Sequence, residues 1–177
     1  MIKRFFAGLV FGLSLVAQAD EAGLCDKIEA VKKNSQQQLE RFSLTQFSFD
    51  NYARDLAIIV HNVNLPAQIQ RVTFNRGQQA SSCYFKPLAF SQGGDWGWHM
   101  LWAEAGGGLF YARMDGEAWV SSNPKRLSKL NPINPQFLIK NQSITVTWQQ
   151  VENGVTVNMQ AISSDEGRSW DIGAVPN

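Results

Sequence analysis

The chain has 177 residues, with 16 lysines and arginines against 15 aspartates and glutamates, and a formal net charge of +1. A near-neutral chain without a basic run carries no electrostatic footprint for nucleic acid, and it lacks the polybasic patch that holds proteins on anionic membranes. The length is typical of a single domain, and we expect no nucleic-acid partner.

Residues 1–19, MIKRFFAGLVFGLSLVAQA, have the three parts of a secretory signal peptide: a basic start, an apolar core and a small-x-small cleavage site. The apolar core is shorter than the roughly 20 residues that span a bilayer, so we expect cleavage before Asp20 rather than a transmembrane anchor. Residues 20–177 would then form one domain that keeps 14 basic and 15 acidic residues, a net charge of −1. The predicted location is the periplasm or the outside of the cell, two compartments that a signal peptide does not distinguish.

Cys25 and Cys83 are the only cysteines of the chain. An isolated pair in an oxidising compartment most simply forms one disulfide, which would stabilise the fold by about 4 kcal/mol in the chain-entropy model. A metal site or a reactive thiol is the alternative. The chain has no CxxC pair, and His61 and His99 lie far from each cysteine in sequence, so we expect neither a metal nor another cofactor.

The first part of the mature chain has the composition of a helix. Residues 24–42, LCDKIEAVKKNSQQQLERF, are rich in helix formers and lack Gly and Pro. Their apolar side chains recur at intervals near three and four, which predicts an amphipathic helix on a core, and we expect helical structure over residues 20–45. The next stretch, NYARDLAIIVHNV, is compatible with either a short helix or a buried strand.

From residue 68 to residue 177 the sequence predicts an antiparallel β meander. Six segments rich in β-branched and aromatic residues are separated by turn signals such as NRG, GGG and ENG. They are IQRVTF, SCYFKPLAF, WGWHMLW, GLFYARM, SITVTWQQV and GVTVNMQAI. Residues 121–135, SSNPKRLSKLNPINP, predict a proline-punctuated loop between two strand groups. The predicted fold class is therefore α+β and mostly β, with an N-terminal helix followed by the meander.

The stretch SSDEGRSW, residues 163–170, predicts a hairpin turn held by its own side chains. The Asp165 carboxylate can accept hydrogen bonds from backbone N–H groups within the turn, and the Ser163 hydroxyl can do the same. Gly167 supplies a positive φ at little steric cost. Trp170 can fold its ring onto the layer below and cover the hairpin with a large apolar area.

SSDEGRSW also matches the Asp-box pattern S-x-D-x-G-x-S/T-W at each specified position, namely Ser163, Asp165, Gly167, Ser169 and Trp170. Over about residues 96–170 the chain thus resembles the bacterial neuraminidase repeat of sialidases and related β-propellers. In that family the motif forms the turn between the outer two strands of a blade, so the resemblance implies a partial propeller. A sandwich is the alternative, because Asp boxes also occur on isolated hairpins of other secreted β-proteins. A degenerate second copy, GLFYARMDGEAW, ends 51 residues earlier at Trp119, a spacing close to one blade.

The resemblance does not extend to a sialidase active site. Such a site needs arginines that clamp the substrate carboxylate, a Tyr–Glu nucleophile pair and an acidic general acid, and the family's F/Y-R-I-P arginine motif has no counterpart here. Propellers have four to eight blades, and about a hundred β residues supply two or three. HExxH, GxSxG and Walker motifs are missing from the sequence as well, so we expect no enzymatic activity.

Residues 94–108, GDWGWHMLWAEAGGG, have the most unusual composition of the chain. If one strand runs through them, period two places the three tryptophans on one face and the histidine on the other. The tryptophan face is either the core of the sheet or an exposed aromatic platform that stacks on sugars or anchors a protein partner. In the second interpretation the candidate binding residues are Trp96, Trp98, His99, Trp102 and Glu104.

Three functional classes remain. The preferred one is an exported, non-catalytic recognition protein that binds a protein partner in the envelope, as an inhibitor or an immunity protein does. The second is a glycan-binding module related to sialidase-type repeats. The third is a structural envelope protein that oligomerises. The sequence leaves the identity of the partner and the oligomeric state open.

Overall fold

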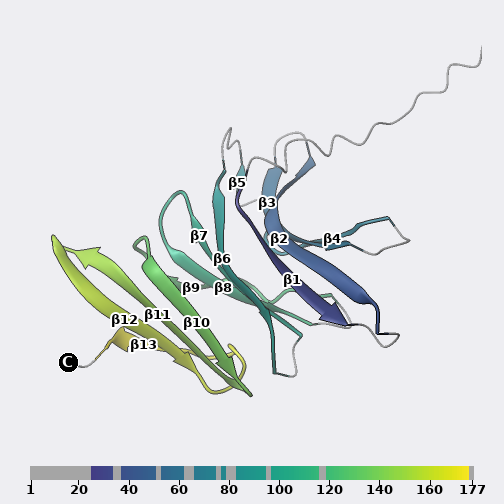
Figure 1. The fold of residues 1–177 in the computed structure, drawn as a ribbon. Helices are drawn as coiled ribbons and strands as arrows, with labels where there is room; N and C mark the ends of the chain where they lie inside the picture. The colour runs from purple at the N-terminus through teal and green to yellow at the C-terminus, as the bar shows by residue number, and fades with distance from the viewer. Residues whose placement is uncertain are drawn as a thin grey trace, which may run out of the picture.

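The computed structural model describes residues 25–33, 37–50, 53–61, 66–74, 77–78, 83–94, 97–115 and 119–175. These residues form strands and their connections, and none of them is helical. The predicted signal peptide lies outside the described residues. Figure 1 shows the strands in three antiparallel sheets that stand side by side.

The three sheets follow one another along the chain, and each is a meander in which neighbouring strands in sequence are neighbours in space. The N-terminal sheet contains β1 (Lys27–Lys33), β2 (Leu39–Asp50), β3 (Ala53–His61) and β4 (Gln68–Arg71), and the short β5 (Gly77–Gln78) pairs with β3. The middle sheet contains β6 (Phe85–Gln92), β7 (Trp98–Glu104), β8 (Leu109–Met114) and β9 (Lys125–Ser128). The C-terminal sheet contains β10 (Ile133–Lys140), β11 (Ser143–Glu152), β12 (Val155–Ser163) and β13 (Asp171–Ala174).

The predicted α+β class and the helix over residues 20–45 are wrong. The described part of that range forms β1 and β2, which pair from Lys27 opposite Thr45 to Lys33 opposite Leu39. Alternate residues of β2, Phe42 and Leu44, are buried against the middle sheet, so burial of a period-two face overrides the helix propensity of the segment. The described part of the ambiguous segment that follows forms β3, and the fold of the described residues is all-β.

The six strand segments predicted after residue 68 are present as β4, β6, β7, β8, β11 and β12. The loop predicted over residues 121–135 is only partly present, because the interval contains β9 and the start of β10. Both are edge strands, where a proline such as Pro135 can be accommodated without breaking the ladder.

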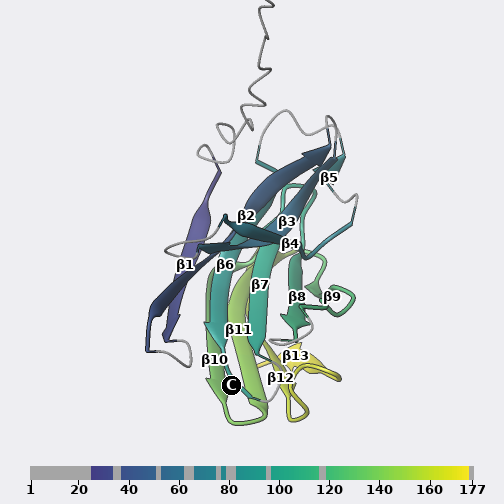
Figure 2. The same cartoon turned by 90° about the vertical axis from the view of Figure 1, so that its right-hand side faces the viewer.

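Two hydrophobic cores separate the three sheets. The first lies between the N-terminal and middle sheets and contains Leu44, Leu56, Ile58, Met100 and other buried residues. The second lies between the middle and C-terminal sheets and includes Leu101, Leu109 and Val146. In Figure 2, which looks along the stack, the N-terminal sheet lies in front of the middle one. The middle sheet is therefore covered on both faces, and all seven residues of β7 are buried.

The second core gives a direct test of the stack. Replacing Leu101, which is fully buried, by alanine leaves a cavity between the middle and C-terminal sheets and should lower the free energy of unfolding by about 2–5 kcal/mol. Leu138→Ala is the matched control, because Leu138 is 64% exposed and its truncation should change stability by less than about 0.5 kcal/mol. Urea unfolding followed by tryptophan fluorescence measures both values, and equal losses would contradict the stacked arrangement.

Candidate functional site

Two of the three tryptophans that the sequence offers as a binding platform, Trp98 and Trp102, lie in the first core. Trp98 is 2% exposed, with its ring centroid 4.5 Å from that of Phe42 and 4.6 Å from that of Phe90. Trp102 is fully buried and stacks on Phe110. Trp96 lies outside the described residues. Trp98 and Trp102 therefore present no aromatic surface to solvent.

His99 points to the opposite face of β7, into the second core, and is fully buried. Its Nε2 lies 2.9 Å from the carbonyl oxygen of Gly93 and its Nδ1 lies 2.7 Å from the hydroxyl of Tyr111. Because a carbonyl only accepts, Nε2 carries the proton and donates it to Gly93, and Nδ1 accepts from Tyr111. Burial lowers the pKa of His99 below its ordinary value and raises the pKa of Tyr111 above its own. Both side chains are therefore neutral in the folded protein near pH 7.

The lowered pKa of His99 predicts a pH-dependent stability. The unfolded chain binds a proton at this residue more readily than the folded protein does. The stabilisation of the folded state that comes from neutral His99 is therefore fully present above about pH 6.5 and is lost as the pH falls below that value. The free energy of unfolding should drop by up to about 1.4 kcal/mol per pH unit on this account. Urea unfolding of the wild type and His99→Gln between about pH 7.5 and 5.5 checks it. A slope in the variant as steep as that of the wild type would contradict the prediction.

The turn from Ser163 to Trp170 joins β12 to β13 and is held by its own side chains. The Ser163 hydroxyl accepts from the backbone N–H of Gly167 at 2.7 Å and donates to Asp165 Oδ1 at 2.8 Å. The Asp165 carboxylate accepts from the backbone N–H of Ser169 at 2.9 Å and from its hydroxyl at 2.6 Å. These hydrogen bonds from Ser169 are the main reason why the pKa of Asp165 is well below its ordinary value. The turn is thus stabilised by an ionised carboxylate.

The same turn fastens the C-terminal sheet to the middle sheet. Trp170 donates from Nε1 to the carbonyl of Gly167, and its ring meets Tyr111 of β8 edge-on at 4.8 Å. The backbone carbonyl of Glu166 lies 3.3 Å from both the Tyr111 hydroxyl and Nη1 of Arg113. The Tyr111 ring lies so close to Gly167 that any side chain at that position would overlap it.

A related contact links the middle sheet to the N-terminal sheet. Trp119 lies in the connection between β8 and β9, which joins the third and fourth strands of its sheet as Ser163–Trp170 does in the C-terminal sheet. The ring of Trp119 stacks on Phe42 of β2 at 6.0 Å. In both described cases, a tryptophan from the connection between the third and fourth strands packs on the preceding sheet.

Gly167 is the position at which this packing is most easily tested. Gly167→Ala places a Cβ against the buried Tyr111 ring, at a φ of 80° that alanine adopts with strain, and should lower the free energy of unfolding by about 2–4 kcal/mol. Gly154→Ala is the matched control, because Gly154 has a φ of 82° and open space around its Cα. Chemical unfolding measures both variants. Equal losses would show that backbone strain alone, and not the contact with Tyr111, makes glycine necessary.

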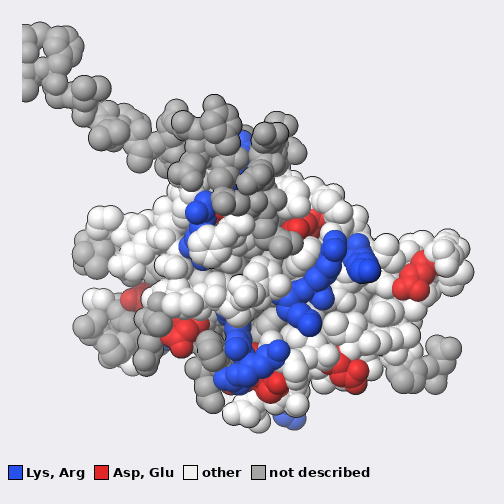
Figure 3. All heavy atoms as spheres, turned by 180° about the vertical axis from the view of Figure 1, so that it is seen from behind, with Lys and Arg blue, Asp and Glu red and all other residues white. Residues whose placement is uncertain are grey.

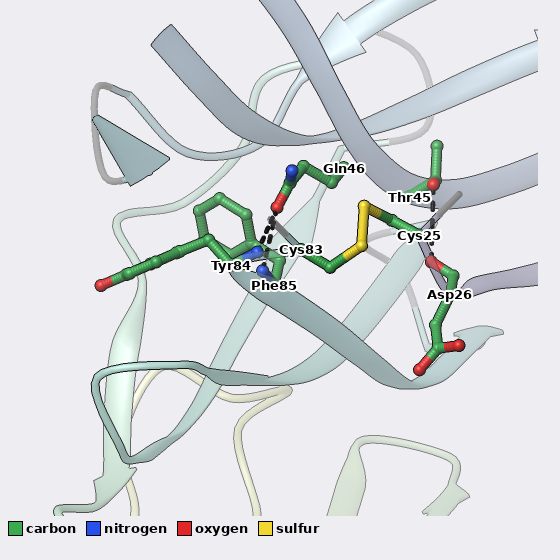
Figure 4. Close-up of a disulfide and its surroundings, with 7 residues drawn as sticks. All are labelled: Cys25, Asp26, Thr45, Gln46, Cys83, Tyr84 and Phe85. Atoms are coloured by element: carbon green, nitrogen blue, oxygen red, sulfur yellow. Dashed lines mark hydrogen bonds between the residues drawn. A yellow bond between two sulfur atoms is a disulfide. The ribbon is translucent and has the colours of Figure 1, made fainter. Parts of the chain in front are cut away.

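The start of β6 is fixed by interactions that converge on residues 83–85. Cys83 forms the predicted disulfide with Cys25, with the two Cα atoms 5.4 Å apart. Gln46 of β2 accepts hydrogen bonds through Oε1 from the backbone N–H groups of Tyr84 at 2.7 Å and Phe85 at 3.1 Å, as Figure 4 shows. The backbone of Tyr84 is therefore held on both sides. Its hydroxyl donates a hydrogen bond to Oε2 of Glu104 at 3.3 Å.

Tyr84 and Glu104 line a cleft of about 490 Å³ between the ends of β6 and β7 and the connection from β9 to β10. This volume is in the range of small-ligand sites. Glu104 as a residue is 6% exposed, and its carboxylate also accepts a hydrogen bond from Nε1 of Trp102 at 3.3 Å. The other lining residues supply one ammonium group, two amides and apolar surface, and they are Cys83, Lys86, Leu88, Ala103, Ala105, Asn131, Pro132, Asn134 and Pro135.

Of the four binding residues named from the sequence that the structure describes, Glu104 alone lines this cleft. Tyr84, Lys86, Asn131 and Asn134 were not anticipated. They come from segments that are separated in sequence, and only the packing of the β9–β10 connection beside β6 brings them together. No local motif carries that information.

The described residues contain no group of three or more His, Cys, Asp or Glu side chains placed to hold a metal ion. No helix long and apolar enough to cross a membrane occurs among them either.

Comparison with known proteins does not assign the chain. No protein-family model matches the sequence, and no curated protein matches it. The geometry of the cleft and the turn must therefore support any functional conclusion.

Proposed function

We propose that this protein is an exported, non-catalytic recognition protein that binds a neutral saccharide in the cleft lined by Tyr84 and Glu104. The observation that carries the proposal is the chemistry of the lining. Asn131, Asn134 and Tyr84 offer donors and acceptors suited to sugar hydroxyls, and the Glu104 carboxylate is a further acceptor. Leu88 and the two prolines offer apolar surface for the C–H faces of sugar rings.

The charges of the cleft favour a neutral ligand. Lys86 and Glu104 are the ionisable lining side chains other than Tyr84, and their charges are opposite. Glu104 is the buried one of the two, so an anionic sugar would bring its charge toward a carboxylate in a partly desolvated site. A sialylated ligand is therefore disfavoured relative to a neutral one.

Binding without hydrolysis is supported by the same lining. Most glycoside hydrolases use two carboxyl groups that flank the scissile bond. Among the described residues that line the cleft, Glu104 is the single acid. An anchored carboxylate with one tyrosine and two amides is suited to holding hydroxyl groups rather than to acid–base chemistry on both faces of a sugar.

The architecture supports a relationship to sialidase-type Asp-box repeats. Three consecutive sheets, each with four strands in sequential order, pack face to face, and the matching motif lies between the third and fourth strands of the last one. The function preferred from the sequence was binding of a protein partner, with exposed tryptophans as candidate contact residues. Trp98 and Trp102 are buried and cannot contact a partner, which weakens that hypothesis. Export rests on the sequence of residues 1–19 and on the Cys25–Cys83 disulfide, which is compatible with an oxidising compartment.

Isothermal titration of the chain from Asp20 with neutral trisaccharides tests the proposal. Gluco-, N-acetylglucosamino- and galacto-configured trisaccharides are the probes, with a sialylated trisaccharide for comparison. We expect at least one neutral probe to bind. Glu104→Gln, which keeps the shape of the side chain but removes its charge, should weaken that binding about tenfold.

Glu29→Gln is the matched control, because it makes the same chemical change at an exposed site on β1, away from the cleft. It should leave the affinity unchanged. Absence of binding by all neutral probes, or a preference for the sialylated one, would overturn the proposal. Capture of one envelope protein with the same sensitivity to Glu104→Gln would instead favour a protein partner in the cleft.

A further inference from the structure

The outer face of the C-terminal sheet is not covered by another sheet of the described chain. Ile144, Val146 and Trp148 of β11 point into the second core, so the residues between them face away from it. Strand pairing places corresponding residues of β10, β12 and β13 on the same outer face. This outer face comprises Gln136, Leu138, Lys140, Ser143, Thr145, Thr147, Gln149, Val151, Thr156, Asn158, Gln160, Ile162, Asp171 and Gly173.

This face carries little charge compared with the rest of the surface. Only Lys140 and Asp171 are charged among its residues, and both lie near one end of the sheet. The outer face of the N-terminal sheet, at the other end of the stack, carries Lys27, Glu29 and Arg41 on adjacent strands. Basic and acidic side chains are also present together on the back of the molecule, as Figure 3 shows. A terminal sheet face that is exposed to water is expected to carry charged side chains.

The uncharged face has the composition of a protein interface. Leu138 is 64% exposed, Val151 48% and Ile162 39%, and they lie among threonines and amides. Interface cores are depleted of charged residues, with charges placed toward the rim. β10, β11 and β12 have eight to ten residues and β13 has four. At about 4.8 by 3.3 Å per residue the flat area is about 500 Å², which corresponds to a small interface, below the roughly 800 Å² per partner of a standard one.

We propose that this outer face binds the same face of a second copy of the chain, giving a dimer with two-fold symmetry. Amide and hydroxyl groups both donate and accept hydrogen bonds, so a face made of them can be complementary to itself, as a symmetric dimer requires. Gln149 and Asn158 already form such an amide pair, at 3.0 Å, across β11 and β12. This dimerisation is independent of saccharide binding in the cleft.

The two charged residues select one arrangement of the copies. Residues that pair across neighbouring strands form rows perpendicular to the strands. A two-fold axis parallel to the strands keeps each row at the same height but reverses the order of the strands, so β10 of one copy lies over β13 of the other. Asp171 pairs with Ile162 and lies one row from the position of Lys140. Lys140 of each copy then approaches Asp171 of the other. An axis perpendicular to the strands within the face would place β10 over β10 and bring no opposite charges together.

Sedimentation equilibrium of the chain from Asp20 over a wide concentration range tests this dimer. We expect the wild type to dimerise and Leu138→Asp to be monomeric, because the substitution buries a carboxylate in the uncharged face. Val31→Asp is the matched control on the outer face of the N-terminal sheet, where Val31 is 57% exposed, and should dimerise like the wild type.

A charge-swap cycle tests the orientation. Lys140→Glu and Asp171→Lys should each raise the dissociation constant about tenfold, since each substitution places like charges together twice in a symmetric dimer. The double variant should return to within about threefold of the wild type. A wild type that stays monomeric at all concentrations overturns the proposal, and so does a dimer that Leu138→Asp leaves intact. If the single substitutions raise the dissociation constant and the double variant does not restore it, the two-fold axis is not parallel to the strands.

Discussion

Burial of the middle sheet on both faces is the constraint on which the rest of this structure depends. A sheet between two others can expose side chains only at its ends and edges, so β7 must be buried along its whole length. Its polar residues are accommodated because each has a partner. His99 lies between Tyr111 and Gly93, and Glu104 accepts from Trp102 and Tyr84. Glu104 is the last residue of the strand, which is why the covered sheet can still offer a carboxylate to a cleft.

The parts of the structure that the sequence predicted are those decided by neighbours along the chain. The turn at Ser163–Trp170 needs a serine, an aspartate and a glycine at fixed offsets, and the hydrogen bonds of the Ser163 and Asp165 side chains close within eight residues. Six of the strands after residue 68 were also predictable, because β-branched and aromatic residues alternate with turn signals, whereas β9 and the start of β10 fell in a stretch predicted as a loop. The cysteine pairing followed because a single pair leaves one combination.

The helix was mispredicted because residues 24–42 satisfy two patterns. Their composition favours a helix, and their apolar residues recur at intervals near three and four. Ile28 and Ala30 nevertheless face the same core as Phe42 and Leu44, to which they pair across β1 and β2. Only the presence of the middle sheet decides between the two patterns. The cleft was unpredictable for a similar reason, since Tyr84, Glu104 and Asn131 meet through packing and not through spacing.

The contacts of Trp119 and Trp170 have a consequence for the order in which the chain can assemble. Each ring packs on the sheet that precedes its own in sequence, so each sheet completes its packing against a surface that has already emerged from an N-terminal start. Cys25 must wait for Cys83 at the beginning of the second sheet before it can be oxidised to the native pair. During synthesis from the N-terminus the sheets can thus fold one at a time, and each folded sheet provides the surface against which the next one packs.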